Sequence, residues 1–106
     1  MSWVFGVPLT KAVEFRAVLQ KGNRIQVPKL VRWEFKMETS QVLKVKVRPL
    51  GAFGQKEYSF CKMSGDGRIT IPKLTLSLLQ DRDSGGKSLV GHILEVQLEP
   101  SGSTSS

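Results

Sequence analysis

The chain has 106 residues, 40% of them hydrophobic, which favours a single domain with a modest core. Its 16 basic and 9 acidic residues give a formal net charge of +7, so we expect an anionic partner, nucleic acid before a membrane surface. A single cysteine, Cys61, excludes an internal disulfide and fits the reducing cytoplasm, and no apolar run approaches the ~18 residues of a membrane span.

The first residues predict an arm followed by a hairpin. Residues 1–10 suggest an extended segment whose Trp3 and Phe5 we expect to pack on the domain rather than to contact a ligand. Apolar and polar residues alternate over residues 13–19, which predicts a strand with one apolar face. Residues 21–23, Lys-Gly-Asn, then predict a tight turn, because glycine and asparagine tolerate a positive φ.

One stretch of the chain occurs twice. Residues 24–30 are Arg-Ile-Gln-Val-Pro-Lys-Leu, and residues 68–74 are Arg-Ile-Thr-Ile-Pro-Lys-Leu. In each copy β-branched residues alternate with polar ones, as in a half-buried strand; the proline then removes a ladder donor and suits the first turn of a helix. Leu74 and Leu78 lie at helical spacing, which predicts an apolar helix face, although Leu74, Leu76 and Leu78 also alternate as in a strand; the parallel with the first copy favours the helix. Each copy therefore predicts a short strand followed by a short helix.

The elements around this stretch are duplicated as well. Residues 57–63 are the counterpart of the first strand, and we expect the turn at residues 64–67 to be one residue longer than the turn at residues 21–23. The strand predicted at residues 42–49 matches residues 93–100, with the same alternation and the same closing proline. The chain thus consists of two strand–strand–helix–strand copies.

Two such copies predict an all-β domain with two short helices. Two three-stranded units, each with an exposed edge, can close on each other around a pseudo-twofold axis and remove those edges. We therefore expect residues 1–100 to form a six-stranded closed barrel, with one copy over about residues 11–49 and the other over about residues 57–100. Because one chain holds both copies, we expect a monomer. Residues 101–106 contain no apolar residue and predict a disordered tail.

The positive charge is concentrated in the first copy. Residues 15–49 hold nine basic and two acidic residues, whereas residues 58–100 hold five of each. Cations on a suitable surface can contact phosphates without reading the base sequence. The alternative is that these side chains form only the solvated face of half-buried strands. The residues from which we expect nucleic-acid contacts lie at the first turn, the first helix and the last strand of this copy: Lys21, Arg24, Lys29, Arg32, Lys44, Lys46 and Arg48.

The second copy carries a family resemblance. Its Arg-Ile-Thr-Ile-Pro-Lys-Leu stretch, the following helix and residues 91–96, Gly-His-Ile-Leu-Glu-Val, resemble the DNA-binding module of SpoVT/AbrB-type regulators. The resemblance implies DNA binding, with basic residues presented at the turn that Lys21 and Arg24 flank. Those regulators are swapped-hairpin homodimers with one unit per chain. A chain with two units looks more similar to cradle-loop barrels, and especially to archaeal stand-alone RIFT-related barrels.

Motifs for catalysis or for a cofactor are missing or incomplete. His92 has no second histidine or cysteine at ligand spacing, so we expect no zinc site. Asp81 and Asp83 begin a sequence like a calcium loop, but the closing position lacks glutamate. Neither a Walker motif nor a dinucleotide fingerprint is present, and the carboxylates are too scattered to suggest an acid–base pair. We therefore expect neither an enzyme nor a bound cofactor.

Three functions remain open at this point. The first is a non-enzymatic DNA-binding protein, a transcriptional regulator of the AbrB kind that contacts the phosphate backbone through a basic face. The second is a cradle-loop barrel that binds a small anionic ligand or nucleotide, as the archaeal CTP-dependent riboflavin kinases of that group do. Its one candidate phosphate loop is at residues 83–88, Asp-Ser-Gly-Gly-Lys-Ser. The third is an interaction module for another protein.

Overall fold

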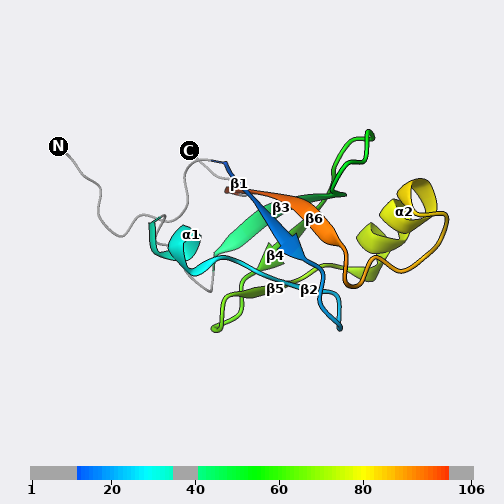
Figure 1. Cartoon of the computed structure of the whole chain (residues 1–106). Helices are drawn as coiled ribbons and strands as arrows, with labels where there is room; N and C mark the ends of the chain where they lie inside the picture. Colours follow the sequence, from blue (N-terminus) through cyan, green and yellow to red (C-terminus); the bar gives the residue numbers. More distant parts are fainter. Residues whose placement is uncertain (1–11, 35–40, 101–106) are drawn as a thin grey trace.

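The computed structural model describes residues 12–34 and 41–100 (Figure 1). The predictions for the N-terminal arm with Trp3 and Phe5, and for the tail at residues 101–106, lie outside these residues. None of the helices within the two described ranges is long and apolar enough to cross a membrane.

The described residues form six antiparallel strands and two helices, which confirms the predicted composition of a mostly β protein with two short helices. Each copy provides two strands, a helix and a third strand in the predicted order, and each helix begins directly after the repeated proline. In chain order the elements are β1 (Val13–Val18), β2 (Arg24–Gln26), α1 (Lys29–Glu34), β3 (Val42–Pro49), β4 (Glu57–Lys62), β5 (Arg68–Thr70), α2 (Lys73–Asp83) and β6 (Ile93–Pro100).

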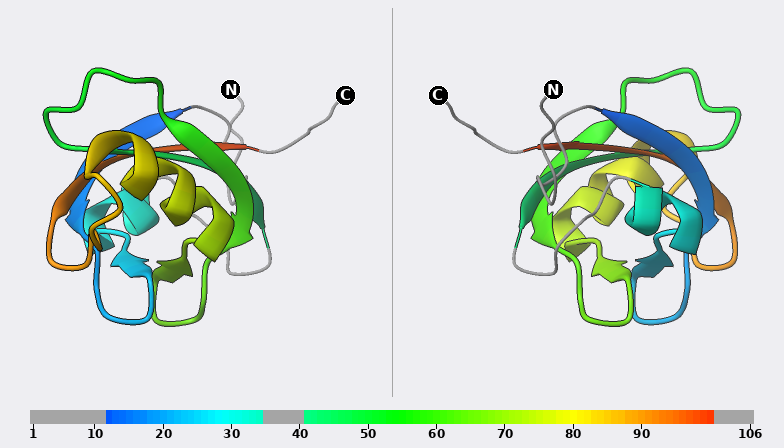
Figure 2. Two further views of the ribbon diagram at one scale, coloured as in Figure 1. Left: turned by 90° about the vertical axis from the view of Figure 1, so that its right-hand side faces the viewer. Right: turned by 90° about the vertical axis from the view of Figure 1, so that its left-hand side faces the viewer.

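The strands form two sheets. Four of them pair in the order β1-β6-β3-β4, and β2 pairs with β5 in a separate two-stranded ribbon. Figure 2 shows the four-stranded sheet on one side of the molecule and the ribbon on the other, with α1 and α2 at the two opposite ends of the space between them. The strand ladders do not join the two sheets, so the closure of all six strands into one barrel stays a prediction.

Equivalent residues of the two copies face each other where the copies meet. In the ribbon Ile25 pairs with Ile69, and in the large sheet Lys46 pairs with Gln97. The pairing of β1 with β6 is repeated, residue by equivalent residue, in the pairing of β4 with β3. The similarity of the copies therefore extends from sequence to strand register.

The two hairpin turns have the same length, so the prediction of a longer second turn is wrong. In the first turn the Gln20 N–H donates to the Arg24 carbonyl at 2.7 Å. The Ser64 N–H donates to the Arg68 carbonyl at 2.8 Å in the second. Gln20 thus already belongs to its turn, as Ser64 does, although its sequence position suggested the end of the strand.

The hydrophobic core lies between the two sheets. Alternate positions of every strand point into it, including Ile25 and Ile69 from the ribbon and Val45 and Val96 from the large sheet, all of them buried. This arrangement follows from the period of two along a strand, which places every second side chain on the same face. The same period sends the basic residues of β3 to the opposite, outward face of the large sheet.

Candidate nucleic-acid interface

The structure divides the seven predicted contact residues between two sides of the molecule. One group lies on or beside β2 and its turn, and we call it the turn group: Lys21, Arg24, Lys29 and Arg32. The other lies on the outward face of the large sheet, and we call it the β3 row: Lys44, Lys46 and Arg48. Because β2 and β3 belong to opposite sheets (Figure 2), the two groups do not form one continuous surface.

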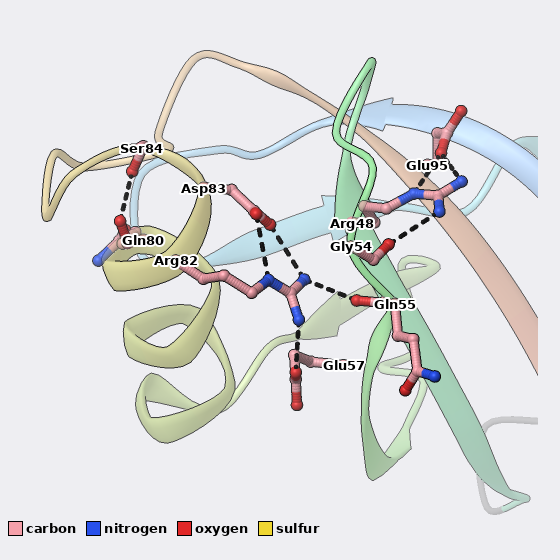
Figure 3. A network of polar contacts seen from close by, with 9 residues as sticks. All are labelled: Arg48, Gly54, Gln55, Glu57, Gln80, Arg82, Asp83, Ser84 and Glu95. Carbon is pink, nitrogen blue, oxygen red and sulfur yellow. Dashed lines mark hydrogen bonds and ion pairs between the residues drawn. The ribbon is translucent and has the colours of Figure 1, made fainter.

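Carboxylates of β6 offset much of the charge of the β3 row. The Arg48 guanidinium donates to Glu95 Oε1 from Nε at 2.9 Å and from Nη2 at 2.7 Å, and its Nη1 donates to the Gly54 carbonyl at 2.9 Å (Figure 3). The two hydrogen bonds from Arg48 to Glu95 hold the pKa of Glu95 below its ordinary value. Lys46 Nζ lies 3.0 Å from the Glu99 carboxylate. Two of the three cations in the row are thus already paired.

The first turn, in contrast, presents unpaired cations. Lys21 and Arg24 are exposed, and neither takes part in an ion pair with another described residue. The turn lies against the start of α2, because the Ile71 N–H donates to the Asn23 carbonyl at 2.7 Å. Lys73, the first residue of α2, follows two positions later and is exposed and unpaired within the same described ranges. Three cations therefore gather near one end of the ribbon.

The second turn packs against the beginning of α1. The Val27 N–H donates to the Gly67 carbonyl at 2.9 Å. The Arg32 guanidinium lies so close to Gly67 that a Cβ atom placed there would be 2.5 Å from Arg32 Cζ. Arg32 Nε is buried and has no hydrogen-bond partner in the part of the chain that the structure describes. Arg32 thus serves the packing of this turn, while Lys29, one turn earlier on α1, is exposed.

The outward face of the ribbon is polar and basic. Ile25 and Ile69 point inward, so their neighbours point away from the core, where Arg24 faces Thr70 and Gln26 faces Arg68. Arg68 Nε donates to Gln26 Oε1 at 3.3 Å, which ties the two strands together on this face. Both hairpin turns extend from the ribbon side of the molecule, away from the large sheet (Figures 1 and 2).

The predicted contact residues left out the second copy's contribution to this surface. Arg68 and Lys73 occupy the positions of Arg24 and Lys29 in the repeat, and Thr70 occupies that of Gln26. The repeat could have indicated these residues, because equivalent residues of the two copies lie on the same face of the antiparallel ribbon.

The candidate phosphate loop at residues 83–88 follows the C-terminus of α2. The Ser84 hydroxyl donates to the Gln80 carbonyl at 3.0 Å (Figure 3), and the Gly86 N–H donates to the same oxygen at 2.7 Å. Hydrogen-bond donors of this loop are therefore used by a backbone carbonyl in the last turn of the helix. The negative end of the helix dipole also faces the loop, which disfavours a bound anion.

The candidate metal ligands are not gathered into a site. Asp83 accepts hydrogen bonds from Arg82 at 3.1 and 3.0 Å, and the same guanidinium reaches Glu57 at 3.0 Å (Figure 3). The exposed His92 belongs to no cluster, and within residues 12–34 and 41–100 no group of three or more histidine, cysteine or carboxylate side chains could hold a metal ion. Asp83 thus positions Arg82 across the gap between α2 and β4.

Comparisons with known proteins concern the fold. No protein-family model matches the sequence, and no curated protein matches it. Among solved structures, the chain is similar to PHS018 from Pyrococcus horikoshii, known from its solution structure, with a TM-score of 0.66 and 18% sequence identity. The similarity covers 88% of this chain and 95% of that one. At such an identity it describes a shared fold and carries no function with it.

Proposed function

We propose that this chain is a non-enzymatic DNA-binding protein built on a closed cradle-loop barrel with internal pseudo-twofold symmetry. The register supports the barrel: Ile25 faces its equivalent Ile69 in the ribbon, and Lys46 faces its equivalent Gln97 in the large sheet. A single twofold axis through both sheets would require these pairings. The resemblance to SpoVT/AbrB-type regulators and to archaeal RIFT-related barrels belongs to the same proposal.

One observation carries the DNA-binding part of the proposal. Lys21, Arg24 and Lys73 are exposed and unpaired in the described structure, and they lie near one end of an outward-facing, polar ribbon. A two-stranded ribbon fits the major groove of B-DNA, which is about 12 Å wide. Cations at the end of such a ribbon can contact the phosphates that border the groove, and such contacts supply affinity on any sequence.

The β3 row has a smaller part in this proposal than its charge suggests. A lysine or arginine that already pairs with a carboxylate gains less from a phosphate, because the existing ion pair has to be broken. Lys46 and Arg48 are in that position. We further propose that the protein acts as a monomer in the cytoplasm, since one chain holds both copies and a single cysteine.

The test compares two double variants that remove the same charge from opposite faces. Lys21→Gln with Arg24→Gln changes the turn group, and Lys44→Gln with Lys46→Gln changes the β3 row. Fluorescence anisotropy with a short labelled duplex of mixed sequence measures affinity at several salt concentrations. We expect the turn variant to bind more weakly on every sequence and to lower the slope of log K against log salt by about 0.9 for each lost phosphate contact. The β3 variant should change both quantities less.

Two results would contradict the proposal. If the wild-type protein does not bind the duplex at low salt, DNA binding is wrong. If both variants weaken binding equally, net charge rather than the ribbon surface determines the affinity. Circular dichroism and thermal unfolding of each variant verify that the fold is unchanged.

A further inference from the structure

Two aromatic side chains are exposed on the outward face of β4. Tyr58 is 56% exposed and Phe60 is 58% exposed, although aromatic rings contribute most to stability when they are buried. The ring centroids are 5.9 Å apart, and the planes meet at 79°, an edge-to-face arrangement. β4 is an edge strand of the large sheet. The two rings therefore form an exposed apolar surface at the border of a mixed-charge face.

Lysines border both rings. Lys44 lies opposite Phe60 on β3, and its Nζ is 4.5 Å from the centroid of the Tyr58 ring. This is cation–π geometry, which holds the ammonium group beside the aromatic pair without a carboxylate partner. Lys62 lies two residues beyond Phe60 on the same face of β4 and is exposed. The aromatic pair thus has an unpaired cation of the described structure on either side.

A groove continues from this surface toward the ribbon. It is open and shallow, with a volume of about 610 Å³, and it is lined by Phe60 and Lys62 of β4, by the second hairpin turn, and by Arg68 and Thr70 of β5. Its two cations are Lys62, which has no ion-pair partner among the described residues, and Arg68, which pairs with Asp66 at 3.6 Å. An extended, negatively charged chain that leaves the two rings could follow the groove.

We propose that the outward surface formed by Tyr58, Phe60, Lys44 and Lys62 binds single-stranded nucleic acid, with bases stacked on the two rings and the backbone phosphates near the lysines. Every base has a flat π-face, so stacking on exposed aromatics requires no particular sequence. Paired bases of a duplex are stacked on each other and cannot reach the rings. This site is therefore distinct in its ligand, as well as in its location, from the ribbon surface.

Charge favours a nucleic acid over a protein as the occupant. An apolar peptide segment could pack on the two rings but would offer no anionic partner to Lys44 and Lys62, and binding it would desolvate both ammonium groups. A phosphodiester chain satisfies both the rings and the lysines. An edge strand such as β4 can also accept a strand from a second copy of the chain, and the test includes that outcome.

The test is a titration of the full chain with a labelled oligothymidine, followed by anisotropy and by NMR of the aromatic ring protons. We expect upfield shifts of the Tyr58 and Phe60 rings on binding. Replacing either ring by alanine should weaken binding about 5- to 150-fold, the range measured for the loss of one stacked base. Tyr58→Phe should bind like the wild type, because it keeps the ring.

Phe53→Ala is the matched control. Phe53 is an exposed aromatic residue as well, but it lies in the connection between β3 and β4, outside the aromatic pair, so its removal should leave the affinity unchanged. Tyr58→Leu and Phe60→Leu keep apolar bulk and should lose affinity without unfolding. Lys44→Gln with Lys62→Gln should weaken binding and flatten its salt dependence, whereas Lys21→Gln with Arg24→Gln should not.

Four results would overturn the proposal. The first is an absence of oligothymidine binding at low salt. The second is a loss of affinity in Phe53→Ala equal to that in Tyr58→Ala or Phe60→Ala. The third is an equal loss of affinity in the turn variant, which would mean that one basic surface binds both ligands. The fourth is concentration-dependent self-association, measured by sedimentation, that disappears in the Tyr58→Ala and Phe60→Ala variants. In that case the aromatic pair is a protein contact.

Discussion

Replacing Gly67 by alanine should destabilise the protein by about 1–3 kcal/mol. Gly67 has φ 85°, a left-handed conformation that costs an alanine roughly 1–2 kcal/mol. The new methyl group would also lie 2.5 Å from Arg32 Cζ and 2.6 Å from Nη1, so the guanidinium would have to leave its position on the turn. Each kcal/mol corresponds to a decrease of about 4–8 °C in Tm for a domain of this size.

Gly65→Ala is the matched control in the same turn. A Cβ at Gly65 meets no atom within 4 Å, and its φ is not in the left-handed region, so we expect a change within about 0.5 kcal/mol. Gly67→Asn should lower the backbone part of this cost, because Asn23 occupies the equivalent position of the first turn with φ 62°, but its Cβ would meet Arg32 as that of alanine does. Urea unfolding followed by circular dichroism measures all three. If Gly67→Ala unfolds at the same urea concentration as Gly65→Ala, the left-handed turn and its contact with Arg32 are refuted.

Two further predictions follow from shifted pKa values. Arg48 lowers the pKa of Glu95, so the stability from this pair is present above the pKa of an unfolded glutamate and is lost as pH falls through the lower folded value. The difference in Tm between the wild type and Glu95→Gln should therefore shrink as the pH is lowered through that window, and a constant difference would contradict the pairing. Burial raises the pKa of the Cys61 thiol, although a hydrogen bond with Ser59 opposes the shift, so iodoacetamide should alkylate the native protein more slowly at neutral pH than the urea-unfolded chain. Equal rates would show that the thiol is not protected.

The sequence pattern was sufficient to predict which side chains of the strands are buried, but not which side chains of the helices are. In a strand, alternation alone decides which side chains share a face, so Ile25 and Val45 could be assigned to the core from their neighbours. Leu74 and Leu78 lie at helical spacing, yet they are 72% and 49% exposed, and α2 buries Thr75 and Leu79 instead. A helix at the end of the space between two sheets buries whichever side faces the sheets. That side depends on tertiary contacts that local periodicity does not contain.

Which cations of the candidate site are free depends on which strands lie side by side, and periodicity does not predict the strand order. Counting charges by copy assigns Lys46 and Arg48 to a basic half and Glu95 and Glu99 to a neutral one. The sheet places β3 beside β6, so these residues of different copies become ion-pair partners. The cations of the first turn have no such carboxylate beside them, because their neighbour from the other copy, Lys73, is basic as well. Non-local pairing thus separates the cations of the first copy into paired and unpaired groups, a distinction that the sequence did not contain.

The two copies have diverged on both sheets, and this divergence separates the surfaces of the two proposed ligands. On the ribbon, both copies keep the arginine that begins their second strand, but Arg68 pairs with Asp66 of its own turn at 3.6 Å, whereas Arg24 has no ion-pair partner among the described residues. On the large sheet the equivalent outward positions have diverged: Glu14 of β1 corresponds to Tyr58 of β4, and Arg16 corresponds to Phe60. The inward positions of both strands still pack against one core. The β1 edge is therefore charged and the β4 edge aromatic, so only the β4 edge carries exposed rings on which unpaired bases could stack.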